Sequence, residues 1–298
     1  MSEAIQNLKS FHNWVKSQQL QRYISSHQVI VDIGCGKGGD LHKFAYLYPK
    51  RLLGIDVNEF HLQEARTRYS TLSNKHHFGT AEFVLGDLRK TETYAKLIAD
   101  GHLNQPNSVD VFNCQNALTY FTDTLSTLKN LVHWIATFLK PGGYWIGSCV
   151  DGDKIVQLLQ KTSNTNQYNN SCGKIQLVKA APADRTVQKR VDTGPQASAA
   201  VQASATASAA ALQSTCGTAV QFELYHSILG EQGVLEYLVD FDTLTTVAAS
   251  EGLRLVETLD FETWYNELYD QSNLSVDEMT FSFLSRSFVF QKIYNTEK

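Results

Sequence analysis

The sequence predicts an α/β protein in which helices wrap a largely parallel β-sheet. Through residues 1–150, short apolar segments alternate with segments whose apolar residues recur at helical spacing, as in repeated βαβ units. The apolar run 29–31 breaks into glycines and is followed by the apolar segment 41–47, as expected where a strand turns directly into a helix. Apolar residues at helical spacing fill 125–139, and Pro141-Gly142-Gly143 ends that segment.

The individual elements follow from these patterns in chain order. Strands are expected where short apolar runs end at a small, polar or acidic residue, namely at 28–33, 51–55, 82–85, 109–114 and 144–150. Helices are expected between them and before the first strand, at 8–24, 41–47, 60–69 and 125–139.

Regular patterning stops near residue 162 and returns after residue 219. The intervening stretch is rich in Asn, Gln, Ser, Thr and Ala, and residues 196–211 contain almost no bulky apolar side chain. Such a segment buries too little apolar surface to offset its ordering entropy, although its alanines could instead form a helix. We therefore expect one domain over residues 1–298, with a low-complexity, mobile insertion at about 162–219. Order is expected to resume at 222–226, 234–241, 244–250, 253–256 and 287–290.

Composition indicates an ordinary globular protein, with 43% hydrophobic and 19% charged residues. The net charge of −4 excludes a global basic field, so any nucleic acid must be held by a local patch. The five cysteines are odd in number and lack C-x-x-C spacing, which favours free thiols in a reducing compartment. Because no apolar stretch reaches membrane-spanning length and no signal pattern begins the chain, we expect an intracellular protein.

The glycine-rich segment 32–40, DIGCGKGGD, is the most informative motif. A turn between a strand and a helix presents backbone N–H groups and the positive end of a helix dipole to a ligand. Gly34, Gly36 and Gly39 fit the loose G-x-G-x-x-G dinucleotide pattern, which is weak by itself. Asp32 discriminates further, because a carboxylate there repels a pyrophosphate but suits an ammonium group. The segment thus favours S-adenosylmethionine over a nicotinamide cofactor.

Acidic residues follow the next two expected strands. Asp56 lies about twenty residues beyond the glycine turn, where an acidic side chain binds ribose hydroxyls in nucleotide-binding sheets. Its alternative role is to cap the following helix. Asp87, after the third strand, is placed to lie beside an adenine ring, and its alternative is a solvated loop carboxylate.

Other polar residues surround the same expected edge. Gln115 and Tyr120 follow the fourth strand, where open parallel sheets bind ligands, although Tyr120 could instead pack in the core. The histidines are scattered, with only His76 and His77 adjacent, and predict no metal site. A loose basic set, whose members could equally be solvated or locally paired, consists of Lys37, Lys43, Arg66 and Arg68.

Together these motifs resemble the mRNA cap guanine-N7 methyltransferase family. The resemblance covers most of the chain outside the insertion, and the glycine segment, the Pro-Gly-Gly-Tyr turn and the Glu-Tyr-Leu-Val segment are its most specific parts. The matching residues are 11–16 (FHNWVK), 32–40 with Leu41 and Lys43, 54–56 (GID), 65–69 (ARTRY), 114–115 (CQ) with Tyr120, 139–146 (LKPGGYWI) and 236–239 (EYLV).

The resemblance implies a fold, a cofactor and two sets of contacts. The fold is the seven-stranded, Rossmann-like S-adenosylmethionine-dependent methyltransferase sheet, with helices on both faces and an antiparallel last strand. The implied cofactor contacts are Lys16, Asp32, Gly34, Asp56, Asp87, Gln115 and Tyr120. The implied contacts to the capped RNA end are His12, Asn13, Lys37, Lys43, Arg68, Thr119 and Glu236.

Three positions depart from the family pattern. Thr119 replaces the family's usual His, so that position can donate one hydrogen bond but cannot stack. His12 stands where Asn is commoner, and residues 283–287 lack the family's cap-contacting Tyr. With the unusual insertion, these departures indicate a divergent enzyme, such as the methyltransferase module of a large DNA virus capping enzyme.

The sequence therefore predicts S-adenosylmethionine-dependent methyl transfer to guanine-N7 of the mRNA cap. That nitrogen has a free lone pair, so we expect in-line attack without a general base and a rate that is flat near neutral pH. This expectation takes Glu236 as ionised, with an ordinary pKa of about 4.3, and His12 as titrating near pH 6.5. The partners would be the capped RNA end and RNA triphosphatase or guanylyltransferase modules, with no metal and no membrane. The location would be the nucleus of a cell, or the host cytoplasm or virion for a virus. The alternatives are an inactive cap- or partner-binding subunit and an NAD-dependent dehydrogenase.

Overall fold

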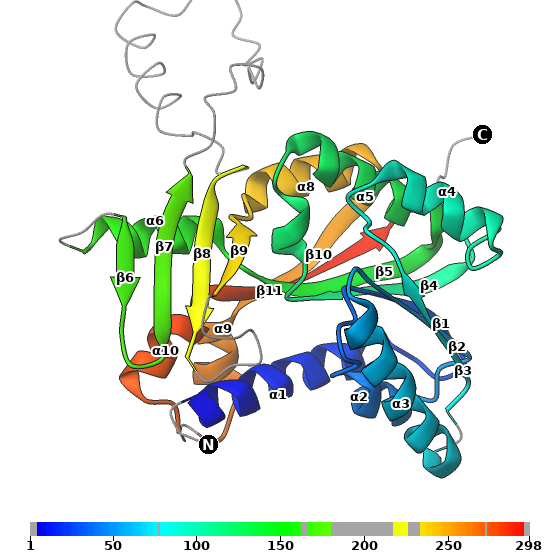
Figure 1. Cartoon of the computed structure of the whole chain (residues 1–298), viewed down its shortest axis with the longest axis horizontal. Coiled ribbons are helices and arrows are strands. Elements are labelled where there is room, and N and C mark those ends of the chain that lie inside the picture. Colours follow the sequence, from blue (N-terminus) through cyan, green and yellow to red (C-terminus); the bar gives the residue numbers. More distant parts are fainter. Residues whose placement is uncertain are drawn as a thin grey trace, which may run out of the picture.

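The computed structural model describes residues 5–76, 78–162, 166–179, 217–225, 233–271 and 273–294. Its centre is a seven-stranded sheet in the order β10-β11-β5-β4-β1-β2-β3 (Figure 1). The strands are β1 (Val29–Ile33), β2 (Arg51–Asp56), β3 (Thr80–Leu85), β4 (Val109–Gln115), β5 (Leu139–Val150), β10 (Leu253–Asp260) and β11 (Ser285–Lys292).

Pairing within this sheet is parallel from β3 through β5. The last strand, β11, runs antiparallel to both of its neighbours, β5 and β10. The predicted parallel sheet with an antiparallel last strand is therefore confirmed.

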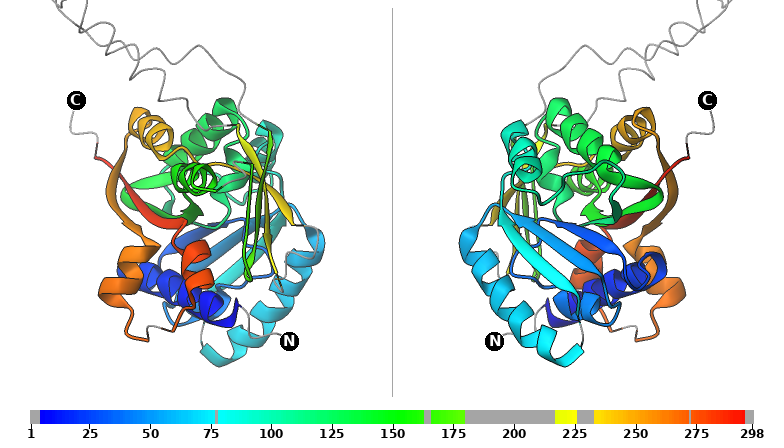
Figure 2. Two further views of the ribbon diagram at one scale, coloured as in Figure 1. Left: turned by 90° about the vertical axis from the view of Figure 1, so that its left-hand side faces the viewer. Right: turned by 90° about the vertical axis from the view of Figure 1, so that its right-hand side faces the viewer.

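Helices cover both faces of the sheet, as Figure 2 shows from two sides. On one face, α4 (Thr91–Ala99), α5 (Leu125–Phe138) and α8 (Phe241–Ser250) bury their apolar residues in a large core with the strands. On the other face, α2 (Leu41–Ala45), α3 (Glu59–His76) and the end of α1 (Gln6–Tyr23) form a second core.

A smaller antiparallel sheet stands beside the main one, in the order β6-β7-β8-β9 (Figure 1). Its strands are β6 (Gln167–Asn169), β7 (Gly173–Lys179), β8 (Ala219–Leu224) and β9 (Val234–Tyr237). It shares a third core with α6 (Gly152–Gln160), α9 (Phe261–Thr263), α10 (Val276–Ser282) and the first half of α1. Helix α1 thus packs on both units, through Phe11 in this core and Leu20 in the core of the main sheet.

The expectation of a mobile insertion is wrong for residues 166–179, because β6 and β7 lie there. These strands carry Ile175 and Leu177, which pack in the third core, and the low overall hydrophobicity of the region masks them. Residues 180–216, including the alanine-rich stretch and its possible helix, lie outside the described residues.

The other predicted elements are confirmed with small changes in their bounds. Helix α3 continues to His76, and β5 begins at Leu139 rather than after the glycine turn. Among the helices that the structure describes, none combines the length and apolar character needed to cross a membrane.

Candidate active site

Four of the predicted cofactor contacts lie at the carboxyl ends of the parallel strands. Gly34 follows β1, Asp56 ends β2, Asp87 follows β3 and Gln115 ends β4. Because these four strands are parallel neighbours, their ends meet at one edge of the sheet, where open α/β sheets bind ligands.

The glycine turn is shaped by close packing on one side and open space on the other. Gly34 has φ +66°, and a Cβ there would lie 2.6 Å from the Cβ of Ala117. Gly36 has φ +52°, and a Cβ would meet nothing within 4 Å. Gly34 therefore lets the turn approach the β4 end closely, while the backbone at Gly36 borders open space that a ligand can enter.

Asp56 is held in place by the turn and by its own strand end. Its Oδ2 accepts a hydrogen bond from the Gly36 N–H at 2.9 Å, and its Oδ1 accepts one from the Asn58 N–H at 2.9 Å. The capping alternative does not hold, because the side-chain oxygen of Asn58 accepts from the first-turn N–H groups of Phe60 and His61. A fixed carboxylate at this position fits a ribose diol.

Asp32 is a nearly buried carboxylate, 6% exposed, beneath the turn. Asn113 donates a hydrogen bond from Nδ2 to its Oδ1 at 2.7 Å. Burial, and next the neighbouring charge of Asp40, raise the pKa of Asp32 to about 7, while Asn113 and Lys16 oppose the rise. A buried carboxylate without a fully compensating cation suits a ligand that brings an ammonium group.

Lys16 and Lys43 both pair with Asp40, which is 8% exposed. Lys43 Nζ lies 2.7 Å from Asp40 Oδ1 and 3.0 Å from the Asn13 side-chain oxygen, and Lys16 Nζ lies 3.7 Å from Asp40 Oδ2. Burial alone would raise the pKa of Asp40, but the two lysines hold it below its ordinary value. This cluster places Asn13 and Lys16 of α1 beside the start of α2.

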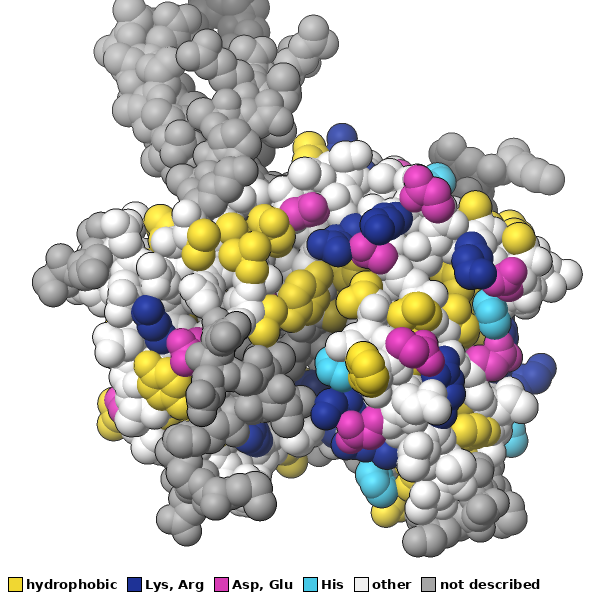
Figure 3. Space-filling model, in the orientation of Figure 1, with side chains coloured by type: hydrophobic (Ala, Val, Ile, Leu, Met, Phe, Trp, Pro, Cys, Tyr) yellow, Lys and Arg dark blue, Asp and Glu magenta, His cyan; other side chains and the backbone are white. Residues whose placement is uncertain are grey.

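Glu236 reaches the same edge from the smaller sheet. Strand β9 packs on the short helix η2 (Leu118–Phe121), and the Thr122 hydroxyl donates to the Tyr237 carbonyl at 3.2 Å. Thr119 lies beside the Glu236 carboxyl. Among the described residues, the buried Oγ1 of Thr119 has no hydrogen-bond partner at the usual distance and angle. Figure 3 shows a hollow on this side of the molecule, with hydrophobic side chains within it and Lys and Arg side chains around it.

Burial changes the ionisation of this part of the site. It raises the pKa of Glu236 to about 7, against a smaller opposing effect of Thr119. The expectation of an ordinary pKa near 4.3 is therefore wrong. Burial also raises the pKa of Tyr120, and the nearby carboxylates of Glu236 and then Asp56 add to that rise.

Lys37 and Arg68 are both paired with one carboxylate at the exposed edge. Lys37 Nζ lies 3.1 Å from Glu64 Oε2, and Arg68 donates to the other oxygen of Glu64. Arg66, by contrast, pairs with Glu59 and donates to the Phe83 carbonyl, so it belongs to the packing of α3 on β3.

His12 lies on the face of α1 that meets α10. Its Nε2 lies 2.8 Å from the Ser282 hydroxyl, and its ring meets Phe261 edge-on with centroids 4.8 Å apart. Burial, with a smaller effect of Lys16, lowers the pKa of His12 to about 3. The prediction that His12 titrates near pH 6.5 is therefore wrong, because the ring packs against Phe261 and the Ser282 hydroxyl.

Asp87 and Gln115 are both engaged within the protein. Arg89 donates to both oxygens of Asp87 at 2.9 Å, which lowers the pKa of Asp87. The Gln115 amide is 8% exposed and bonds to Gln19, Asn113 and Ser148.

Four residues with an evident place around the site are missed by sequence reasoning. Gln19, Asn113 and Ser148 lie in segments that read as apolar helix or strand, and only their polarity at buried positions could have marked them. Glu64 could have been found from its helical spacing to Arg68.

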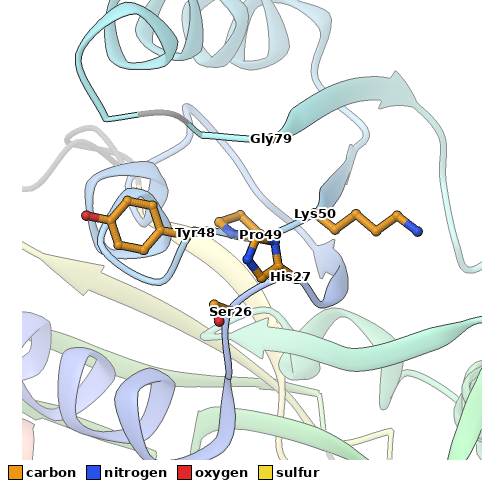
Figure 4. A pocket seen from close by; sticks show the side chains of 6 residues that line it. All are labelled: Ser26, His27, Tyr48, Pro49, Lys50 and Gly79. Atoms are coloured by element: carbon orange, nitrogen blue, oxygen red, sulfur yellow. The ribbon is translucent and has the colours of Figure 1, made fainter.

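A separate hollow lies at the opposite edge of the sheet. It is lined by Ser26, His27, Tyr48, Pro49, Lys50 and Gly79, which precede β1, β2 and β3 (Figure 4). Cys35, Cys114 and Cys149 are buried free thiols, and Cys172 is buried as well. Within the described part of the chain, no three His, Cys, Asp or Glu residues form a metal-binding group.

Comparison with known proteins identifies a family. A family model for the mRNA (guanine-N(7))-methyltransferase domain matches residues 1–192. The chain is 25% identical over 310 residues to mRNA cap guanine-N(7) methyltransferase 1 of Oryza sativa subsp. japonica, covering 96% of this chain and 74% of that protein. It is 31% identical over 178 residues to the mRNA cap guanine-N(7) methyltransferase of Caenorhabditis elegans, covering 55% and 44%. The chain thus spans less than half the length of the nematode relative.

Solved structures share the fold at low sequence identity. The CcbJ methyltransferase from Streptomyces caelestis superposes with a TM-score of 0.54 at 15% identity, covering 94% of this chain and 88% of that one. An S-adenosylmethionine-dependent methyltransferase from Clostridium acetobutylicum gives 0.52 at 11%, covering 96% and 92%. The family match extends over more than half of the sequence and agrees with the sheet order and the glycine turn. The chain belongs to the mRNA cap guanine-N7 methyltransferase family, and S-adenosylmethionine is its cofactor.

Proposed function

We propose that this chain transfers a methyl group from S-adenosylmethionine to guanine-N7 of the 5′ cap of mRNA. The observation that carries the proposal is the position of Glu236. Strand β9 brings this carboxylate to Thr119 and Tyr120, at the strand edge that also holds Asp56. A base-recognising group and a cofactor-binding edge therefore face one site.

The cofactor end is assigned to residues on the first strands. Asp32 would bind the ammonium group, Asp56 the ribose hydroxyls, and the Gly34–Gly36 backbone would approach the ligand closely. Asp87 would lie toward the adenine. Lys16 would act through Asp40, the carboxylate with which it pairs. Gln115 and Tyr120 complete the contacts that the resemblance implies.

The cap end is assigned to Glu236 and a set of cations. The ionised carboxylate of Glu236 can accept hydrogen bonds from the guanine N1–H and 2-amino groups. Lys37, Lys43 and Arg68 would offset the charge of the triphosphate bridge, with Asn13 beside them. His12, which packs on α10, would support the placement of α1 rather than meet the cap.

Methyl transfer at this site requires orientation more than proton transfer. When bound, the cofactor supplies an activated methyl group on a sulfonium. Guanine-N7 presents a lone pair, so the protein has only to hold the base in line and exclude water. We therefore assign no general base.

The wider setting is inferred from the family alone. Capping needs RNA triphosphatase and guanylyltransferase activities before N7 methylation, so we propose that the chain works with such modules inside the cell. A location in the nucleus, or in the cytoplasm or virion of a large DNA virus, remains a prediction.

The test is incubation with labelled S-adenosylmethionine and GpppG-capped RNA, followed by identification of the product. We expect N7-methylguanine caps from the wild type and a large loss of activity in Glu236→Ala at any ionic strength. Equal activity on ApppG-capped RNA would reject the guanine assignment. Cap binding without methylation would support the inactive-subunit alternative, and NADH binding as tight as that of S-adenosylhomocysteine would support the dehydrogenase.

A further inference from the structure

A continuous set of buried polar side chains leads from the interior of the main sheet to Asp32. Gln19 of α1 is 1% exposed, and Asn113 of β4 is 0% exposed. Gln115 lies between them, and Ser148 of β5, 1% exposed, bonds to it. Burying an amide away from water costs free energy unless each of its donors and acceptors is hydrogen-bonded. We therefore expect this set of buried amides to have a function.

The set begins at two backbone carbonyls, which can only accept hydrogen bonds. The Gln19 Nε2 group lies 3.0 Å from the Gly147 oxygen and 2.9 Å from the Phe288 oxygen. Both amide hydrogens of Gln19 are therefore used, and its Oε1 is left to face Gln115 Nε2 at 2.7 Å.

The direction of the remaining bonds follows from this start. Gln115 Nε2 donates one hydrogen to Gln19 Oε1 and the other to Asn113 Oδ1, at 3.0 Å. With its oxygen facing Gln115, Asn113 must turn its Nδ2 toward Asp32 Oδ1, at 2.7 Å. Reversing any one amide would bring two donors or two acceptors together, so the set has a single orientation that ends in a donor on Asp32.

We propose that Gln19 and Asn113 are positioning residues, which hold a hydrogen-bond donor on Asp32 and so keep its carboxylate ionised for the ammonium group of the cofactor. The inference rests on the proposed role of Asp32. It also gives α1 a part in cofactor binding, because Gln19 bonds to the sheet and to Gln115 only while the helix is docked.

The charges around Asp32 show why such a donor matters. Asp40, at the start of α2, and Asp56, at the end of β2, both disfavour its ionisation. Lys16 of α1 favours ionisation, but Lys16 is itself paired with Asp40. The thiols of Cys35 and Cys114 lie near enough to Asp32 to be affected by its charge; burial, together with that charge, raises their pKa values, so they remain neutral. Asn113 is the neutral donor that is bonded directly to Asp32.

The test is the affinity for S-adenosylhomocysteine, measured by calorimetry from pH 5.5 to 8.5. In the wild type, affinity should rise with pH as Asp32 ionises and level off above neutrality. Asn113→Leu removes the donor, so the midpoint of this rise should move up by about one pH unit or more, with affinity at pH 6.5 falling roughly tenfold. Gln19→Leu leaves Asp32 and Asn113 in place but frees the Gln115 amide, and should shift the midpoint in the same direction by less.

Ser148→Ala is the matched control. It removes a buried hydroxyl that donates to Gln115 Oε1, but leaves every bond from Gln19 to Asp32 intact. Its midpoint should equal that of the wild type. Thermal unfolding of each variant checks the fold, and Gln19→Leu decides the question if Asn113→Leu does not fold.

The outcomes separate this inference from the assignment of the site. If the folded Asn113→Leu and Gln19→Leu variants bind less tightly by the same factor at every pH, the role of these residues is structural and the inference is wrong. If Asp32→Asn binds S-adenosylhomocysteine as tightly as the wild type, the proposed cofactor role of Asp32 is wrong instead.

Discussion

The two ends of the site are built on opposite principles. At the cofactor end, Asp32 and its amide partners are buried, and each amide has one orientation. At the proposed cap end, which we call the phosphate end, Lys37 and Arg68 are more than a third exposed and share the carboxylate of Glu64. In the proposed assignment, the cofactor end is thus arranged before its ligand arrives, whereas the phosphate end would exchange a carboxylate for the phosphates of the ligand.

This difference determines where binding energy and specificity arise. A buried carboxylate that lacks a full counter-charge gains strongly from a cationic ligand, at the expense of the stability of the free protein. Exposed ion pairs contribute little to stability and are screened by salt. We expect mutations at the cofactor end to have large, pH-dependent effects and mutations at the phosphate end to have small, salt-dependent effects.

Asp32→Asn should have the largest effect: it should weaken cofactor binding and raise the stability of the ligand-free protein. Losing a charge-assisted contact should weaken S-adenosylhomocysteine binding roughly 10- to 150-fold. The pKa of Asp32 is raised from 3.8 to about 7 in the folded protein. Its charge therefore costs stability that grows as the pH rises through this window. Without ligand, Asp32→Asn should melt about 2–4 °C higher than the wild type at pH 8, and this difference in melting temperature should vanish toward pH 4.

Calorimetry and thermal unfolding at both pH values measure these two effects. For thermal unfolding, Asp87→Asn serves as the control, because Arg89 already compensates that carboxylate and lowers its pKa, so this variant should melt no higher than the wild type at pH 8. A lower melting temperature for Asp32→Asn at pH 8 would show that the charge is compensated in the free protein.

Glu64→Gln should have a modest effect at the phosphate end. Freeing Lys37 and Arg68 should raise the affinity for capped RNA about threefold at low salt, and the gain should disappear at high salt. Glu59→Gln is the matched control, since it breaks the Glu59–Arg66 pair on the same helix without freeing a cap-assigned cation. Fluorescence titration with GpppG-capped RNA at two salt concentrations measures both. Weaker binding by Glu64→Gln would show that Glu64 orients the cations instead of competing for them.

Deleting residues 195–214 and joining the ends should have the smallest effect. From its composition, this segment offers little apolar surface to a core, and closing a shorter loop costs little. The melting temperature should stay within about 2 °C and cap methylation should be unchanged. Loss of methylation with an intact fold would make the segment a functional element.

The sequence predicts the main sheet well because its signals are local. Alternating apolar strands and helices, and the glycine turn with Asp32, depend on residues that are close together in the chain. The smaller sheet is harder to predict, since β7 and β8 are brought together across the low-complexity segment. Only the tertiary fold then places Glu236 beside Tyr120.

The pKa values of the site residues could not be predicted from the sequence either. Glu236 and His12 have ordinary reference values as residue types, and their shifted pKa values arise chiefly from burial in the folded protein. The amide set from Gln19 to Asp32 joins residues of α1, β4 and β1 in the same way. Residue type and spacing identify which groups can act, and packing decides their charge.

The central claim is that pH acts through binding groups and that methyl transfer itself has no general base. Single-turnover methylation of GpppG-capped RNA, with S-adenosylmethionine saturating at each pH, tests it most directly. With the enzyme also saturating the RNA, the rate should be flat from pH 6 to 8.5. With the RNA unsaturated, kcat/KM should rise about tenfold per pH unit below pH 7, because Glu236 must be ionised to accept the guanine edge. In Glu236→Gln this rise should be absent, and His12→Ala should keep the wild-type profile. A saturated rate that climbs tenfold per pH unit across neutrality, or a rise that survives in Glu236→Gln, would contradict the account.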